Sequence, residues 1–285
     1  MTSGEEPAGE RAAIDMTQPH VARIYNFWLG GSDNFAADRT VARRVATEYP
    51  DVVASVRAQR AFLARAVHFL AAEAGIRQFL DIGTGLPSAD NTHQVAQRTA
   101  PEARVVYVDN DPIVLAHARA LLTSSPEGAT AYIDADLRAP GPILEQAAGV
   151  LDFGQPIAVM LLGILHGIRD LEQPGAIITQ LMDAVPPGSY LALSQIAGDV
   201  AADEVAKGVQ RYNDQVAVPV TARTHTEVCG FFAGLELIEP GVVQAHRWRP
   251  ATGSRNDDSN LAIYAGVGRK PLNRVRTAAA GRSAR

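Results

Sequence analysis

Apolar and polar positions alternate along the chain in two different rhythms. Short, almost continuous apolar runs such as FLDI and VVYV are typical of buried strands, and longer segments between them carry apolar residues at helical spacing. Strands that alternate with helices in this way form a parallel sheet covered on both faces. The pattern predicts five parallel strands, at residues 78–82, 104–109, 130–134, 157–163 and 190–195.

The segments between these strands predict helices, and several of them have a proline near the first turn, where no backbone N–H is needed. These helices are expected at residues 52–74, 90–99, 112–122, 142–148 and 174–185. Two more helices are expected at residues 199–212 and 224–233, before a hairpin at the sheet edge whose strands flank a polar loop over residues 244–260. The predicted fold class is α/β, with a seven-stranded, mostly parallel sheet and helices on both faces.

The chain contains no internal repeat and no low-complexity spacer, which indicates one domain over residues 18–268. Residues 1–17 are rich in Gly, Glu, Pro, Ser and Thr, and residues 269–285 carry six basic residues and no acid. Both ends are therefore expected to be flexible tails. Residues 18–50, called the N-terminal segment below, are predicted to be a helical region of unusual composition within the domain.

The composition excludes several classes of function. A chain of 285 residues with 47% hydrophobic and 20% charged content can bury one substantial core. Its net charge of -5 argues against nucleic acid or a membrane as partner, because both attract a basic surface. A single cysteine, no signal peptide and no apolar run of membrane-spanning length predict a cytoplasmic protein. The histidines lack metal-ligand spacing, so no metal site is expected.

A glycine-rich turn follows the first predicted strand, in the stretch FLDIGTGLPSADNTHQ. Gly83 and Gly85 let the backbone approach a ligand, and the next helix offers free N–H groups at its start. A tight strand-to-helix turn without a ligand is the alternative. Ser88 stands where a dinucleotide fingerprint has its third glycine, and Asp81 would repel a pyrophosphate. A cationic ligand therefore fits this turn better than NAD.

Acids also follow the second and third predicted strands. Asp109 in YVDNDP can accept hydrogen bonds from both hydroxyls of a ribose, and Asp136 in DADLR can accept one from the amine of adenine, with Leu137 against the ring. Each acid alone could equally be a helix cap or a solvated loop residue. Together they favour a nucleotide-like cofactor, because open α/β sheets bind ligands at the carboxyl ends of their strands.

The motifs DIGTG, VDNDP and DADLR resemble the successive motifs of class I S-adenosylmethionine-dependent methyltransferases. Longer stretches, including ARIYNFWLGGSDNFAADR, FLDIGTGLPSADNTHQVAQ, VVYVDNDPIVLAHARALL and ILHGI, resemble the actinobacterial family of S-adenosyl methyltransferase-like proteins, once classed as a domain of unknown function. The resemblance covers nearly the whole chain. It implies a Rossmann-like methyltransferase fold with S-adenosylmethionine as the cofactor, and it implies no defined acceptor.

The resemblance also implies roles for single residues along the strand ends. The cofactor-binding residues implied in this way are Asp81, Gly83, Thr84, Gly85, Asp109, Asn110, Asp136, Leu137 and Gly163. The stretch from Gly163 to His166 is expected near the sulfonium and the acceptor. Its sequence GILHGI differs from the Pro-Pro-Tyr-like motif of many enzymes that methylate nitrogen in nucleic acid or protein, which disfavours those acceptors.

The N-terminal segment is interpreted as a lid over the cofactor. Its paired glycines followed by Asp-Asn indicate a turn that approaches something closely, and Arg23 is the candidate for the cofactor carboxylate, because a guanidinium pairs with a carboxylate in a fixed fork. Tyr25, Asn26 and Asn34 are candidate lid or substrate residues, together with Tyr212 after the fifth strand. A purely structural helix pair is the alternative.

Methyl transfer from a sulfonium requires alignment and a dry site rather than a protein nucleophile. If the acceptor is a hydroxyl or an amine, His166 is the candidate general base, and a purely structural histidine is the alternative. The leading hypothesis is O- or N-methylation of a small molecule. A non-catalytic S-adenosylmethionine-binding regulatory protein and, with less support, a nicotinamide-dependent oxidoreductase are the other hypotheses.

Overall fold

The computed structural model describes residues 15–87, 90–121, 124–251 and 261–272. These residues form an eight-stranded sheet with the strand order β3-β2-β1-β4-β5-β8-β6, in which β7 also pairs with β8. The first five strands in chain order are parallel, which confirms the predicted parallel sheet. They are β1 (Gln78–Ile82), β2 (Arg104–Asp109), β3 (Ala129–Asp134), β4 (Ala158–Leu162) and β5 (Tyr190–Ile196).

The last three strands run antiparallel to their neighbours. β8 (Ile263–Arg269) lies beside β5, and the short strands β6 (Glu236–Leu237) and β7 (Val243–Gln244) pair with β8, so the predicted edge hairpin is confirmed. The polar loop predicted over residues 244–260 begins instead with the end of β7 and a 3-10 helix, η3 (Ala245–Arg247). The pairing of β7 with β8 could not be predicted from a stretch of mainly polar residues. Residues 252–260 of the predicted loop lie outside the described part.

The first residues of the predicted basic tail belong to the fold. Arg269 ends β8, and the Lys270 ammonium donates hydrogen bonds to the carbonyl oxygens of Met182 at 2.7 Å and Val185 at 2.8 Å. These two carbonyls lie near the end of a helix, where a cation is favourable. Residues 1–14 and 273–285, which make up most of both predicted tails, lie outside the described residues.

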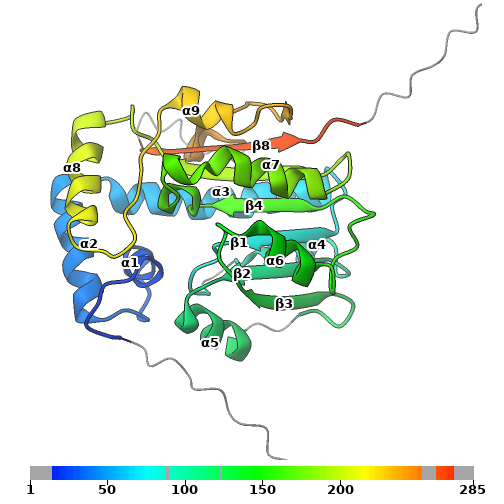
Figure 1. The fold of residues 1–285 in the computed structure, drawn as a ribbon, viewed down its shortest axis with the longest axis horizontal. Coiled ribbons are helices and arrows are strands. Elements are labelled where there is room, and N and C mark those ends of the chain that lie inside the picture. The colour runs from blue at the N-terminus through cyan, green and yellow to red at the C-terminus, as the bar shows by residue number, and fades with distance from the viewer. Residues whose placement is uncertain (1–14, 88–89, 122–123, 252–260, 273–285) are drawn as a thin grey trace, which may run out of the picture.

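Helices cover both faces of the sheet, with α6 and α7 on the face nearer the viewer and α3 and α4 behind it (Figure 1). Most predicted helices are confirmed with their ends shifted by a few residues. The helices are α1 (Val21–Trp28), α2 (Ala36–Glu48), α3 (Val52–Ala72), α4 (Thr92–Thr99), α5 (Pro112–Leu121), α6 (Pro140–Ala147), α7 (Pro174–Ala184), α8 (Ala202–Asn213) and α9 (His225–Gly230), with 3-10 turns η1 (Leu165–Gly167) and η2 (Asp170–Glu172).

The period-two pattern of the strands divides the core into two halves. In β2, Val105 and Tyr107 pack with α3 and α4, whereas Val106 and Val108 pack into the opposite cluster that contains residues of α6 and α7. Successive side chains of a strand point to opposite faces, so a sheet covered on both sides requires apolar residues at nearly every position. This explains the continuous apolar runs of the sequence.

The N-terminal segment forms α1 and α2, as predicted, and α2 lies beside α8 at one end of the sheet (Figure 1). At the surface, Arg211 of α8 pairs with Glu48 of α2 at 3.1 Å, and Arg44 of α2 donates a hydrogen bond at 2.6 Å to Gln215, just after α8. Segments far apart in the sequence are thus brought together at the end of the molecule toward which the parallel strands run.

Candidate active site

A cavity of about 180 Å³ lies at the carboxyl ends of the parallel strands. Its walls come from the ends of β1 to β4, from α1 and α3, and from the region around α8. Most of the residues singled out in the sequence line it. They are Tyr25, Asp81, Gly83, Thr84, Gly85, Asp109, Asn110, Asp136, Leu137, Gly163, His166 and Tyr212.

The glycine turn after β1 has the geometry that its sequence predicts. Gly83 and Gly85 have φ angles of +77° and +63°, in the left-handed region that other residues avoid. A Cβ atom on Gly83 would lie 2.6 Å from the Cβ of Ile164, so a side chain there would collide with the turn after β4. The two strand ends therefore approach each other closely, and backbone lines the cavity at this point.

Asp81 is a buried carboxylate in the wall of the cavity. Its Oδ2 accepts a hydrogen bond from the Thr92 hydroxyl at 2.6 Å. Burial raises the pKa of Asp81 to about 6, although the Thr92 hydrogen bond and the charge of Arg60 oppose this shift. A buried carboxylate with so few partners is electrostatically suited to a cationic ligand group.

Asp109 fixes the two loops that flank the cavity. Its Oδ2 accepts from the backbone N–H of Gly85 at 2.9 Å, and its Oδ1 accepts from that of Asp111 at 3.0 Å. Burial raises the pKa of Asp109, and these two hydrogen bonds partly counter the effect. Each carboxylate oxygen has two lone pairs, so both oxygens retain an acceptor site for the hydroxyls of a ribose.

Asp136 lies on a more exposed side of the cavity beside the buried Leu137. It accepts a hydrogen bond from the Asn110 side chain at 3.2 Å and forms an ion pair with Arg138 at 3.3 Å. Arg138 also forms an ion pair with Glu172 at 2.6 Å, which connects the loop after β3 to the 3-10 turn η2 that follows β4. Arg138 also lines the cavity, although the sequence did not mark it as a site residue.

His166 is in η1, directly after β4, and its Nδ1 has no hydrogen-bond partner among the described residues. Burial, with a contribution from the charge of Arg223, lowers the pKa of His166 to about 4. The imidazole is therefore neutral at pH 7 and can accept a proton. It is a weak base, so it suits an acceptor group whose proton is already acidic.

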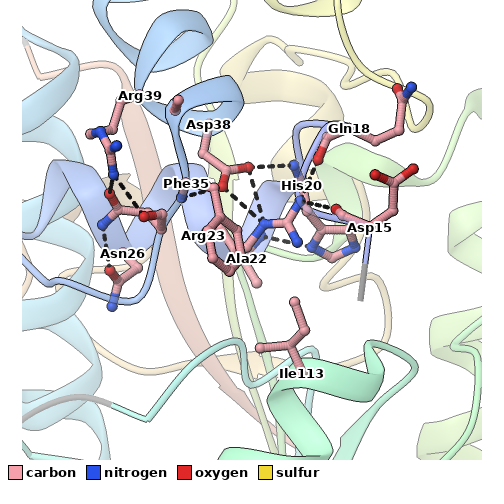
Figure 2. A network of polar contacts seen from close by, with 12 residues as sticks. Asp15, Gln18, His20, Ala22, Arg23, Asn26, Phe35, Asp38, Arg39 and Ile113 are labelled. Atoms are coloured by element: carbon pink, nitrogen blue, oxygen red, sulfur yellow. Dashed lines mark hydrogen bonds and ion pairs between the residues drawn. The ribbon is translucent and has the colours of Figure 1, made fainter. Parts of the chain in front are cut away.

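Arg23 does not lie where the lid interpretation placed it. It is buried within the N-terminal segment, where its Nε lies 3.0 Å from Asp38 (Figure 2). It is not among the residues that line the cavity. Asp38 also accepts hydrogen bonds from the backbone N–H groups of His20 and Phe35, both at 2.8 Å. The expectation for Arg23 is corrected: its carboxylate partner is Asp38, which a fifteen-residue separation did not reveal.

Asn26 and Asn34 also serve the turn between α1 and α2. The Asn34 amide donates hydrogen bonds of 2.9 Å to Asn26 Oδ1 and to the carbonyl oxygen of Gly31, and Arg39 donates to the carbonyl oxygen of Asn34 at 2.7 Å. Neither asparagine is among the cavity-lining residues. The paired glycines therefore bring the backbone close to other residues of the N-terminal segment and not to a ligand. Of the candidate lid residues in this segment, only Tyr25 lines the cavity.

Several residues of the cavity were missed by the sequence analysis. Gln59, Arg60 and Leu63 of α3 line it, and Arg60 donates a hydrogen bond to Asn91 at 3.1 Å. The available signal was Gln59, a polar residue on the mainly apolar buried face of α3. His20 also lines the cavity, and its Nδ1 lies 2.9 Å from Asp111, joining the N-terminal segment to the loop after β2.

The described residues contain no group of three or more His, Cys, Asp or Glu side chains that could hold a metal ion. Among the described helices, none is both long and apolar enough to cross a membrane.

A parallel sheet with a glycine turn and cavity-lining acids at or just after three strand ends defines a nucleotide-cofactor-binding α/β protein. The chain belongs to the S-adenosyl methyltransferase family, whose model matches residues 7–271. This confirms the resemblance seen in the motifs, the Rossmann-like methyltransferase fold and S-adenosylmethionine as the cofactor of the family.

Two solved structures share this fold at high identity. A DUF574 family protein from Streptomyces avermitilis is 43% identical, with a TM-score of 0.87, and the match covers 90% of this chain and 99% of that one. A protein from Thermobifida fusca, provisionally named a methyltransferase, is 40% identical, with a TM-score of 0.84, covering 90% of this chain and 97% of that one. The search of curated proteins found no match.

Proposed function

We propose that this protein transfers the methyl group of S-adenosylmethionine to a small-molecule acceptor. The observation that carries the proposal is the convergence of Asp81, Asp109 and Asp136 on one cavity beside the glycine turn. Three acids from the ends of different strands line this one cavity, and we assign each of them to a different part of an adenosyl cofactor. A structural role for one of these acids would not explain all three.

The donor set fits the cofactor part by part. Asp109 is placed to hold the ribose hydroxyls, and Leu137 offers an apolar surface for the adenine beside Asn110 and Asp136. Asp81 and Arg60, a carboxylate and a guanidinium, also line the cavity. We assign Asp81 to the ammonium and Arg60 to the carboxylate of the methionine part, in place of Arg23.

When bound, the cofactor supplies an activated methyl group, and the chain supplies alignment and exclusion of water. The N-terminal segment covers the cavity through Tyr25 and His20, which reduces access of water to the reacting atoms. Neutral His166, after β4, is assigned to receive the proton of an acceptor hydroxyl. A carboxylate acceptor would need no such base.

A transfer assay tests this proposal. Purified protein is incubated with S-adenosylmethionine carrying an isotope-labelled methyl group and a panel of neutral small molecules, and labelled product is followed together with S-adenosylhomocysteine. The proposal predicts equal amounts of both products, and their loss in His166→Ala with cofactor binding retained. Saturable cofactor binding without transfer to any compound of the panel would instead favour a regulatory S-adenosylmethionine-binding protein.

A further inference from the structure

A second cavity, of about 100 Å³, lies beside the first and is called the acceptor chamber below. It is enclosed by α1, α2, α3 and α8 on one side and by the ends of β5 and β8 on the other. Its walls are mainly aliphatic and aromatic. The apolar lining residues are Val21, Tyr25, Trp28, Val45, Tyr49, Val52, Val56, Ile196, Val205, Val209, Tyr212, Val220, Ala262 and Ile263.

Six residues line both cavities, so the two spaces meet at a shared wall. Polar groups in the acceptor chamber are concentrated there, because Tyr25, Gln59, His166 and Tyr212 belong to both linings. Away from this wall the polar side-chain groups of the lining are paired within the protein: the Ser55 and Tyr49 hydroxyls lie 2.6 Å apart, and the Trp28 indole N–H donates to the carbonyl oxygen of Ala42 at 3.2 Å. A molecule in the chamber therefore meets unpaired hydrogen-bonding groups at the end nearer the first cavity, the one lined by Asp81, Asp109 and Asp136, which is called the cofactor cavity below.

Two polar atoms of the shared wall have no partner among the described residues. The Tyr212 hydroxyl and the His166 Nδ1 are both buried without a hydrogen bond. Buried polar groups in folded proteins are normally paired, and exceptions are expected at functional sites. A hydroxyl and a neutral ring nitrogen together match a ligand that has one group able to accept and donate a hydrogen bond.

Charge limits the acceptor further. Within the part of the chain that the structure describes, no Asp, Glu, Lys or Arg lines the acceptor chamber. Moving a charged group into such surroundings without a partner is costly, so carboxylates and protonated amines are disfavoured. A hydroxyl remains neutral, and a phenol is acidic enough to yield its proton to a weak base more readily than an aliphatic alcohol does.

We propose that the acceptor is a neutral phenol whose ring and substituents occupy the acceptor chamber, with its hydroxyl between Tyr212 and His166 at the shared wall. This inference rests on the proposed methyltransferase function. In the transfer, the phenol oxygen forms a bond to the methyl carbon while the carbon–sulfur bond breaks and its electron pair stays on sulfur. As the oxygen–carbon bond forms, the phenol oxygen becomes a much stronger acid, so its proton passes to His166 Nδ1 in the same step and from there to solvent.

Binding of three small probes tests the chamber independently of turnover. The probes are 4-propylphenol, propylbenzene, which lacks the hydroxyl, and 3-(4-hydroxyphenyl)propionate, which carries a charge at the far end. Isothermal titration is performed on the full chain with and without S-adenosylhomocysteine. We expect 4-propylphenol to bind about fivefold more tightly than propylbenzene, through one net hydrogen bond, and at least about a hundredfold more tightly than the propionate.

Variants locate the bound probe. Val209 lines the acceptor chamber and not the cofactor cavity, so Val209→Phe should abolish binding of 4-propylphenol while Val209→Ala retains it, with S-adenosylhomocysteine affinity unchanged in both. Tyr212→Phe should remove the preference for 4-propylphenol over propylbenzene. Tyr132→Phe, outside both linings, is the control that should keep it. Because Tyr212→Phe removes an unpaired hydroxyl, its unfolding temperature should not fall.

The outcomes separate this inference from the proposed function. If 4-propylphenol fails to bind protein that does bind S-adenosylhomocysteine, or if the propionate binds equally well, the assignment of a neutral phenol is wrong. If Val209→Phe binds the probe as the natural protein does, the chamber is not its site. If 4-propylphenol binds with the predicted pattern but S-adenosylhomocysteine does not bind, the chamber assignment stands and the methyltransferase proposal fails.

Discussion

The two cavities of this protein differ in how the sequence builds them. The cofactor cavity is made largely of short contiguous motifs, such as the turn that carries Asp81 and Gly83, each of which ends one strand. The acceptor chamber is assembled from single residues of α1, α3, α8 and the last strand, such as Tyr25 and Tyr212. The position of the cofactor cavity follows from the topology of the sheet, whereas the acceptor chamber depends on how separate helices pack against one another.

The same contrast holds for charge. Three carboxylates line the cofactor cavity, and two of them have their pKa raised by burial, so this half is prepared for hydrogen bonding and for positive charge. The acceptor chamber contains no Asp, Glu, Lys or Arg among its described lining residues. Substitutions should therefore be able to disturb cofactor binding and acceptor selectivity separately.

The largest expected effect is on folding and comes from the N-terminal segment. Arg23→Ala leaves the buried Asp38 without its cation, which should lower the free energy of unfolding by about 3–5 kcal/mol. Arg211→Ala breaks a surface pair with Glu48 and should cost at most about 1 kcal/mol. Urea denaturation measures both. An Arg23→Ala variant of unchanged stability that binds S-adenosylhomocysteine poorly would restore the original lid assignment.

Arg60→Ala should weaken binding of S-adenosylhomocysteine by about 1.5–3 kcal/mol, because it removes a charged hydrogen bond to the cofactor carboxylate. Methylthioadenosine lacks that carboxylate, so its affinity should change little. Titration of both ligands into the variant and the natural protein makes the comparison. Equal losses for the two ligands would show that Arg60 acts on the shape of the cavity instead.

Asp109→Ala should weaken the affinity of the cofactor by about 1–3 kcal/mol through loss of ribose hydrogen bonds. Asp134 is the matched control: it pairs in register with Asp109, is exposed and does not line the cavity. Asp134→Ala should leave affinity unchanged. If the two variants bind S-adenosylhomocysteine equally, the ribose assignment of Asp109 is rejected.

A smaller effect is expected from pH. The pKa of Asp81 is raised to about 6, so its carboxylate is protonated as the pH falls below that value and can no longer pair with an ammonium group. S-adenosylhomocysteine affinity should therefore fall by about tenfold between pH 7 and pH 5. Asp81→Asn should bind weakly and without this pH dependence. A wild-type profile that is flat over this range contradicts the assignment.

The stability of the ligand-free protein should change with pH in the opposite direction. For a carboxyl group whose folded pKa is raised, the folded state binds the proton more tightly than the unfolded chain does. The contribution of Asp81 is therefore unfavourable above about pH 6 and is relieved as the pH falls toward 4. Asp81→Asn should be more stable than the natural protein at pH 7, and the difference should shrink under acid conditions.

Much of the fold and most of the cofactor cavity could be predicted from the sequence because their signals are local. The apolar runs define β1 to β5, and Asp109 follows from its place at the end of one of them. Arg23 and Arg60 show where local signals fail. Both are helical arginines, and only tertiary packing decides that Arg23 meets Asp38 while Arg60 faces the cavity. The acceptor chamber was not predictable for the same reason.

The most direct test of the account is isothermal titration of the purified protein with S-adenosylmethionine, S-adenosylhomocysteine and NAD in parallel. We expect saturable binding of S-adenosylmethionine and S-adenosylhomocysteine and no binding of NAD. In Asp109→Ala the binding of the first two ligands should be lost or strongly weakened. Binding of NAD alone, or of none of the three by a folded protein, would contradict it.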